Sequence, residues 1–115
     1  MPHLIIEYSN GALDQVGVGR LMEQLFEAAW QTGVMKPEDI KVRARRYEDF
    51  LVAGRKDSFV HLSVYLLAGR TPEQKVTLSE RLRATMMELC PEVVSLSVDI
   101  RDMDPDAYKK RVRRS

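Results

Sequence analysis

The chain has 115 residues, of which 44% are hydrophobic and 30% are charged, a composition typical of one soluble globular domain. A formal net charge of +1 gives no reason to expect a nucleic acid or an acidic membrane as partner, and no apolar run suits a membrane span or a signal peptide. A lone cysteine, Cys90, cannot form an internal disulfide, which favours a reducing cytoplasm as the setting.

The first two predicted elements are a strand and a helix. Residues 2–8 are rich in β-branched and aromatic side chains and predict a strand, which a turn signal at residues 9–11 ends. Apolar residues then recur at helical spacing over residues 13–31, and Gly33 suits the end of that helix. The apolar stripe of the helix comprises Val18, Leu21, Met22, Leu25 and Ala29.

Two strands are predicted in the middle of the chain. In the first of them, Ile40, Val42 and Ala44 alternate with the cations Lys41, Arg43 and Arg45. This alternation is typical of a strand with one buried face. The second strand covers residues 59–66, and residues 54–58 supply the turn between the two strands.

A second helix begins with strong start signals. Thr71 can act as the N-cap, Pro72 suits the first helical position, and Gln74 stands where a capping box requires it. The predicted inward face comprises Val76, Ser79, Leu82, Met86 and Leu89. Pro91 ends this helix, because proline cannot continue it.

A last strand completes the order β-α-β-β-α-β. In this strand Leu96, Val98 and Ile100 alternate with Ser97, Asp99 and Arg101. Helices follow the first and third strands, so each half forms a β-α-β unit with a right-handed crossover. The predicted fold class is therefore α+β, with a four-stranded mixed sheet and two helices packed on one of its faces.

The two halves of the chain resemble each other, which indicates an internal duplication. Residues 2–11 align with residues 60–69 at a constant offset. The matching pairs are His3 with His61, Leu4 with Leu62, and Ile6 with Val64. Pro2 in the first half and Arg70 in the second have no identical partner, so each half would have kept a different piece of one site.

We expect a single domain over residues 1–115, with repeat halves at about 2–57 and 58–104 and a basic C-terminal tail at 105–115. The tail contains Lys109, Lys110, Arg111, Arg113 and Arg114. We interpret this tail as a solvated or subunit-contacting segment rather than as a nucleic-acid-binding one.

Three cations mark the sheet face that the helices leave uncovered. Lys41, Arg43 and Arg45 belong to that face, while Arg70 stands just before the second helix, where backbone N–H groups and the helix dipole also favour anions. Together they predict an anionic ligand such as a carboxylate held by a guanidinium fork. A charged face that forms salt bridges across a subunit contact explains the three strand cations equally well. In either case, oligomerisation would cover this face.

Pro2 is the candidate catalytic base. If Met1 is removed, as is usual before a small residue, the chain begins with the secondary amine of Pro2. Amino termini titrate near ~7.7–8.0 in model peptides, and nearby arginines and partial burial would lower the pKa of this amine. Such a base can take a proton from an enol, or from a carbon next to a carbonyl, and return it elsewhere. The alternative is a proline at a strand edge with no catalytic role.

The other residues with metal-binding or nucleophilic chemistry have structural explanations. His3 and His61 occupy equivalent positions on the open face, where a zinc pair is conceivable, but the sequence offers no third ligand, and structural histidines are favoured. Cys90 ends a helix without an evident His or Asp partner, so we interpret it as a buried structural thiol.

Several segments together resemble one enzyme family. Residues 1–7, Met-Pro-His-Leu-Ile-Ile-Glu, resemble the start of the 5-carboxymethyl-2-hydroxymuconate isomerases of the tautomerase superfamily. Residues 59–62 and 68–71 resemble the middle of the same family, and residues 69–75 are also similar to the start of the short 4-oxalocrotonate tautomerases. The order and spacing of these segments extend the resemblance over residues 1 to about 104.

The resemblance implies a trimer of duplicated β-α-β units with the free sheet faces turned inward, and it implies neither a metal nor a cofactor. It also implies that the N-terminal proline moves a proton along a conjugated dienol to give an enone. Pro2 matches that proline, and Arg70 matches the family arginine that binds a substrate carboxylate. A second family arginine falls at Lys41, with Arg43 two residues on along the same face. Either of these cations replaces it, or the substrate differs, because lysine keeps the charge and loses the bidentate fork.

The lead hypothesis is therefore a cytoplasmic, homotrimeric isomerase that ketonises a carboxylated dienol such as 5-carboxymethyl-2-hydroxymuconate, as in aromatic acid catabolism. Pro2, Arg70 and Lys41 would be its catalytic residues and Arg43 a substrate-binding residue. Two alternatives stay open. One is a tautomerase-superfamily enzyme that acts on a different keto or halogenated acid, and the other is a trimeric binding protein without turnover.

Overall fold

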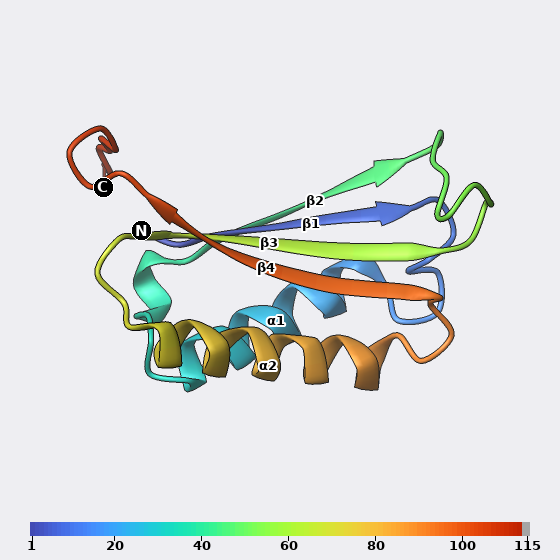
Figure 1. Cartoon of the computed structure of the whole chain (residues 1–115), viewed down its shortest axis with the longest axis horizontal. Coiled ribbons are helices and arrows are strands. Elements are labelled where there is room, and N and C mark those ends of the chain that lie inside the picture. Colours follow the sequence, from blue (N-terminus) through green and yellow to red (C-terminus); the bar gives the residue numbers. More distant parts are fainter. Residues whose placement is uncertain (114–115) are drawn as a thin grey trace.

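A computed structural model describes residues 1–113, so Arg114 of the basic tail lies outside the described residues. The elements in chain order are β1 (His3–Ser9), α1 (Val18–Gln31), the 3-10 helix η1 (Pro37–Asp39), β2 (Lys41–Tyr47), β3 (Phe59–Leu67), α2 (Pro72–Leu89) and β4 (Ser95–Met103). Both α-helices lie on one face of the sheet (Figure 1). The predicted order of elements and the α+β fold class are confirmed. Among the described residues, no helix combines the length and the apolar composition needed to cross a membrane.

The strands lie in the order β2-β1-β3-β4 and form a mixed sheet. Each outer strand runs parallel to its inner neighbour, as a β-α-β unit requires, because the helix returns the chain to the same end of the sheet. The two inner strands are antiparallel, with Leu4 opposite Val64 and Ile6 opposite Leu62. A common origin of the two halves remains a prediction.

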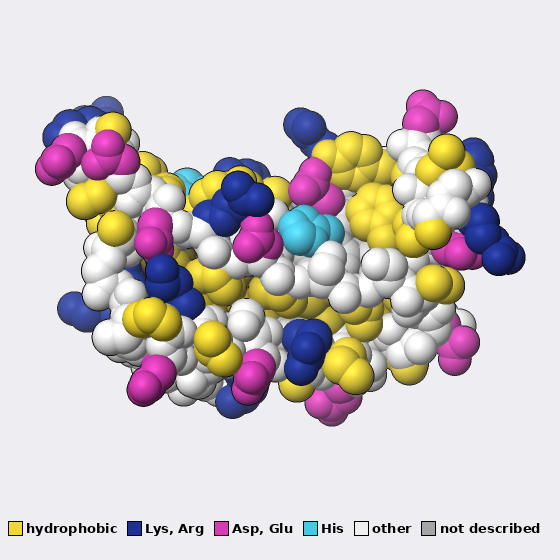
Figure 2. Space-filling view, viewed as in Figure 1, with side chains coloured by type: hydrophobic (Ala, Val, Ile, Leu, Met, Phe, Trp, Pro, Cys, Tyr) yellow, Lys and Arg dark blue, Asp and Glu magenta, His cyan; other side chains and the backbone are white. Residues whose placement is uncertain are grey.

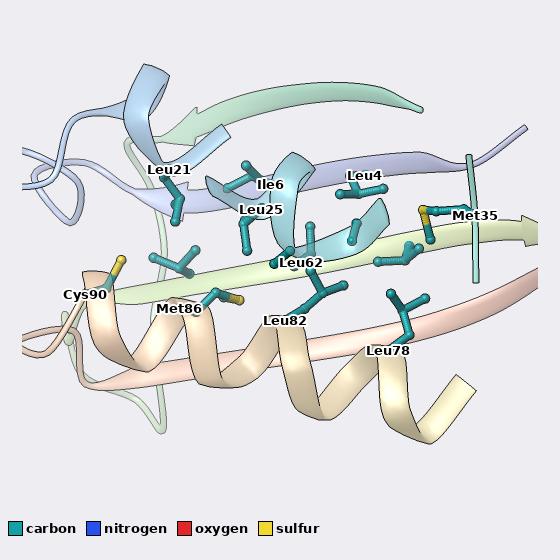
Figure 3. Packing of buried hydrophobic residues seen from close by; sticks show 14 of the residues in the cluster. Leu4, Ile6, Leu21, Leu25, Met35, Leu62, Leu78, Leu82, Met86 and Cys90 are labelled. Atoms are coloured by element: carbon teal, nitrogen blue, oxygen red, sulfur yellow. The ribbon is translucent and has the colours of Figure 1, made fainter. Parts of the chain in front are cut away.

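The core fills the space between the sheet and the two helices. Figure 3 shows Leu4, Ile6 and Leu62 from the sheet, Leu21 and Leu25 from α1, and Leu78, Leu82 and Met86 from α2. All of these residues are 0% exposed. Because burying one large aliphatic side chain contributes about 1.5–3 kcal/mol, this layer holds both helices on one face. The opposite face of the sheet is left free of them.

The helix α1 begins later than predicted. Residues 13–17 form turns, because Gly17 has a φ of 85°, a left-handed conformation that a right-handed helix cannot include. The Gly17 amide donates to the Leu13 carbonyl at 2.8 Å and closes the last of these turns. Leu13 is only 2% exposed. Its apolar side chain fits the pattern because it is buried in the core, and not because it belongs to the helix.

The inward face of α2 also differs from the prediction. Val76, predicted to face inward, is 53% exposed, whereas Leu78 is completely buried. Leu78, Leu82 and Met86 repeat every four residues and therefore line one side of the helix. Val76 precedes Leu78 by two residues, about 200° around the helix axis, and so faces away from the sheet.

The start of α2 contains the predicted capping box. The Thr71 hydroxyl accepts a hydrogen bond from the Gln74 amide at 3.1 Å, and the Gln74 side chain accepts one from the Thr71 amide at 2.9 Å. Thr71→Ala should therefore lower the free energy of unfolding, measured in urea, by about 1 kcal/mol. Thr77→Ala is the control, because Thr77 is exposed within the same helix. Equal losses in the two variants would contradict the capping role.

Candidate active site

The N-terminus lies at the end of the sheet where β1 and β2 both begin. The Pro2 carbonyl accepts a hydrogen bond from the Lys41 amide at 3.0 Å, and His3 stands in register with Lys41 across the two parallel strands. Pro2 is fully buried, while Met1 ahead of it is half-buried. The pairing of β1 with β2 thus fixes the first residues of the chain beside the cationic strand.

The N-terminal amine lies among positive charges. Burial is the largest cause that lowers the pKa of this amine, and the nearby Lys110, Arg70 and Lys41 lower it further, whereas Asp39 of η1 raises it. In the structure the amine belongs to Met1. Removal of Met1 would move the amine to Pro2, one residue along the chain and within the same end of the sheet.

Arg70 lies at this end because it ties two connections of the fold together. Its Nε and Nη2 donate to the Val34 carbonyl at 3.3 and 3.2 Å, and its Nη1 donates to the Leu67 carbonyl at 3.1 Å. A guanidinium has five N–H donors, so two remain for a ligand. The backbone bonds fix where the charge lies, and the remaining donors can meet an anion there.

Lys41 and Arg43, the two candidates for the second anion-binding cation, occupy different surroundings. Lys41 lies close enough to the amine to lower its pKa, whereas Arg43 Nη1 donates to Nδ1 of His3 at 3.0 Å. Both side chains are exposed. Within the described part of the chain, no carboxylate lies at ion-pair distance from Lys41, Arg43 or Arg70. These three charges are therefore available to an anionic ligand.

The C-terminal segment, residues 104–113, adds two residues that the sequence analysis missed. Tyr108 Oη lies 2.9 Å from Nε2 of His3, and Lys110 Nζ contacts the Met1 sulfur. Figure 1 shows this segment turning back toward the N-terminus after β4. The sequence marks this segment only as a basic tail, and the contact between residues 3 and 108 depends on a long-range turn that no local pattern encodes.

Arg45, the third cation of β2, lies apart from the amine. It stands in register with Glu7 and beside Tyr47, whose hydroxyl donates to the Glu7 carboxylate. The hydrogen bond to Glu7 raises the pKa of the Tyr47 phenol. Arg45 therefore has a carboxylate neighbour across the strands, and the three alternating cations belong to two different environments.

The open face is hollowed next to Arg43. A pocket of about 310 Å³ there is lined by Ile5, Glu7, Arg43, Ala44 and Arg45. In Figure 2 the C-terminal segment, which carries Lys and Arg side chains, rises at one end of this face, and the outline dips before the opposite end. The face that the helices leave free is thus concave, with basic and acidic side chains at both of its ends.

His61 and Cys90 do not join the group of residues around the N-terminal amine. His61 pairs with Glu7, whereas His3 pairs with Tyr65, so the two histidines lie at different positions along the sheet. Within residues 1–113, no group of three or more His, Cys, Asp or Glu side chains could hold a metal ion. Cys90 is buried, as predicted, and burial raises the pKa of its thiol.

The arrangement of these groups suits proton transfer to and from an anionic substrate. An amine of lowered pKa can exist as the free base near neutral pH and accept a proton. The neighbouring guanidinium and ammonium groups can bind carboxylates and stabilise negative charge that develops as the proton leaves.

The chain matches the model of one protein family and is similar in fold to several solved structures. A model described as 5-carboxymethyl-2-hydroxymuconate isomerase matches residues 2–113. No curated protein matches the chain. A 5-carboxymethyl-2-hydroxymuconate isomerase structure from Deinococcus radiodurans R1 is 24% identical, with a TM-score of 0.84 over 97% of this chain and 90% of that one.

Two further solved structures extend this likeness. A 5-carboxymethyl-2-hydroxymuconate delta-isomerase is 19% identical, with a TM-score of 0.83 over 98% of this chain and 89% of that one. A fused 4-OT, described as a wild-type symmetric trimer, is 22% identical, with a TM-score of 0.75 over 89% of this chain and 85% of that one. The structural likenesses confirm the predicted tautomerase-like fold.

Proposed function

The chain belongs to the 5-carboxymethyl-2-hydroxymuconate isomerase family, and from this premise we propose that it ketonises a carboxylated dienol such as 5-carboxymethyl-2-hydroxymuconate, with the Pro2 amine as general base and acid. Because the family is one of isomerases, the chain is an enzyme that shifts carbon–carbon double bonds. One observation supports the choice of base: at the start of β1, burial and three cations lower the pKa of the N-terminal amine, which is that of Met1 in the structure, although Asp39 raises it.

In the proposed reaction the Pro2 nitrogen takes the proton from the enol hydroxyl of the substrate. The O–H bond breaks, the carbonyl forms as electrons move along the diene, and the proton is delivered to the carbon at the far end, where a C–H bond forms. The amine is neutral again at the end, so the reaction consumes no other reactant. A single group whose pKa lies near the working pH serves both transfers.

The cations would bind the substrate and stabilise the dienolate. Arg70, with two unused N–H donors beside its backbone bonds, would hold one carboxylate. Lys41 or Arg43 on β2 would hold another, since both are exposed on the open face. Fixed positive charges of this kind stabilise an anion that exists only during the reaction.

We also propose that three copies assemble with their uncovered sheet faces turned inward. Neighbouring subunits would then form part of the walls of the active-site pocket. A relative of the same fold is described as a symmetric trimer, which supports this assembly. Light scattering coupled to size-exclusion chromatography should give three times the 13.2 kDa mass of the chain. A monomer at micromolar concentration would contradict the proposed assembly.

The proposed reaction is tested with protein shown by mass spectrometry to begin at Pro2. With 5-carboxymethyl-2-hydroxymuconate, the absorbance of the conjugated dienol should fall, and the acid limb of the activity should lie below the ordinary amine pKa of ~7.7–8.0. If the protein instead turns over a different keto or halogenated acid, the proposed substrate is wrong and the chain is a tautomerase-superfamily enzyme with another substrate. Binding of such acids without turnover, by a chain that keeps Met1 in the cell, would favour a trimeric binding protein.

The charges around the amine predict how the pH profile responds to substitution. The base works only when unprotonated, so the acid limb of kcat/KM reports the pKa of the amine in the free enzyme. Lys110→Gln removes a cation that lowers this pKa, and the limb should move to higher pH. Asp39→Asn removes a carboxylate that raises this pKa, and the limb should move to lower pH.

Lys109→Gln is the matched control for these two variants, because it neutralises an exposed lysine beside Lys110 in the same segment. The control should leave the acid limb where it is in the wild type. Shifts in the same direction for Lys110→Gln and Asp39→Asn would contradict the N-terminal amine as the titrating base.

A further inference from the structure

We propose that His3 is a positioning residue that aims Arg43 as the second carboxylate-binding group, and that Tyr108 fixes the orientation of its imidazole. The inference rests on the proposed function and deepens it, because it chooses Arg43 over Lys41 and names the residues that hold it. Two hydrogen bonds in series carry it: Arg43 to His3 at 3.0 Å, and His3 to Tyr108 at 2.9 Å.

The direction of both hydrogen bonds follows from the donors present. A guanidinium can only donate, so Nδ1 of His3 accepts from Arg43. A neutral imidazole then carries its proton on Nε2, which donates to the Tyr108 hydroxyl oxygen. Burial, Arg43, Lys41 and the N-terminal amine lower the pKa of His3, which favours this neutral form.

The contact with His3 turns the Arg43 side chain toward the N-terminus. Arg43 stands in register with Ile5, whereas the residue opposite His3 is Lys41. Arg43 therefore reaches back along β1 by two residues, about 7 Å, to meet the imidazole. Its guanidinium therefore lies beside His3, the first residue of β1, and it has the bidentate fork that Lys41 lacks.

The C-terminal segment holds Tyr108 over His3. The Ala107 and Tyr108 amides donate to the Asp104 carbonyl at 3.2 and 2.9 Å, and the Asp106 amide donates to the Asp104 carboxylate at 2.9 Å. These bonds fold the chain after β4 into a compact turn. The His3 and Tyr108 rings then meet edge to face, with centroids 5.8 Å apart and an interplanar angle of 75°. The tail is thus part of the site.

Kinetics with the proposed substrate test the coupling of His3 to Arg43. His3→Leu removes the acceptor and should raise KM about tenfold, with a smaller effect on kcat. His3→Asn should restore most of the affinity, because its amide oxygen can take the place of Nδ1. In the Arg43→Lys background, His3→Leu should add little, since both changes disable the same group. Independent, multiplicative effects of the two substitutions would overturn the proposal.

A second measurement does not depend on turnover. The chain has two histidines, so His61→Gln assigns the imidazole ¹⁵N signals, and His3 should carry its proton on Nε2. Tyr108→Phe should weaken that preference, raise KM about threefold, and reduce the calorimetric affinity for adipate, a dicarboxylate that cannot react. A His3 proton on Nδ1 would overturn the inference. So would a Tyr108→Phe variant that keeps the wild-type tautomer, KM and adipate affinity.

The same measurements separate this inference from the proposed function. If the Nε2–H tautomer and the adipate binding are as expected but no dienol is turned over, the proposed reaction fails and the positioning of Arg43 stands. If turnover depends on Pro2 while the tautomer is wrong, the reaction stands and the role of His3 fails.

Discussion

Pro2→Ala should lower kcat by about 10²–10⁴-fold, the range that a positioned general acid–base contributes, while the chain stays folded. Alanine is small enough for Met1 to be removed, so the variant still begins with an amine at the same end of β1. That amine is primary and lacks the pyrrolidine ring, which fixes the direction of the nitrogen in the wild type. The substitution therefore changes the base and leaves its electrostatic surroundings in place.

Two measurements make the result for Pro2 decisive. Mass spectrometry shows which residue begins each chain, and the unfolding midpoint shows whether loss of the buried ring has destabilised β1. Wild-type chain produced with Met1 retained is the matched control, because its Pro2 nitrogen is an amide with no basic lone pair. Both proteins should be similarly poor catalysts, and wild-type turnover by either one would exclude Pro2 as the base.

Arg70→Ala should lower kcat/KM by about 10²–10³-fold, as expected when a donor to a developing anion is removed. Its three backbone hydrogen bonds hold the guanidinium at the N-terminal end of the site. The same bonds predict a loss of stability of about 1–3 kcal/mol, because the Val34 and Leu67 carbonyls lose their donor. Activity and urea unfolding must therefore be measured on the same preparation.

Two further variants serve as controls. Arg70→Lys separates the effect of positive charge from that of the guanidinium geometry, and Arg83→Ala tests whether the loss of any exposed arginine lowers activity. Arg70→Lys keeps the charge but lacks the planar fork that can bind a carboxylate with two N–H groups while others bond the carbonyls, so kcat/KM should stay well below the wild-type value. Arg83→Ala removes an exposed arginine from α2 and should leave kcat/KM within about twofold of the wild type. Full activity of Arg70→Lys would show that positive charge alone is sufficient at this position.

Local patterns predicted most of the fold. The alternation in β2 and β4 and the capping box at Thr71 each depend on residues a few positions apart, so the sequence displays them directly. The predicted start of α1 and the predicted inward face of α2 were wrong, because an apolar residue can belong to a buried helix face, to a buried turn or to the exposed surface. Leu13 is buried in a turn that Gly17 closes, and Val76 is an exposed apolar residue on a helix whose buried side runs through Leu78.

The candidate site was predictable only in part. Alternation placed Lys41, Arg43 and Arg45 on one face, and the register of β1 with β2 then separated Arg45, beside Glu7, from the other two. The contact between Tyr108 and His3 spans 105 residues, and it depends on how the chain turns after β4. Spacing along the sequence contains no information about such a contact.

The N-terminus and the C-terminal segment, residues 104–113, lie at the same end of the sheet, which has a practical consequence for protein production (Figure 1). A purification tag before Met1 would turn the terminal nitrogen into an amide, and a scar left by protease cleavage would do the same. A tag after the last residue would extend from the segment that contacts His3 and Met1. The tip of the 48–58 loop, where Ala53 and Gly54 have positive φ values of 52° and 76°, lies at the opposite end. An affinity peptide inserted at that tip would leave both termini native.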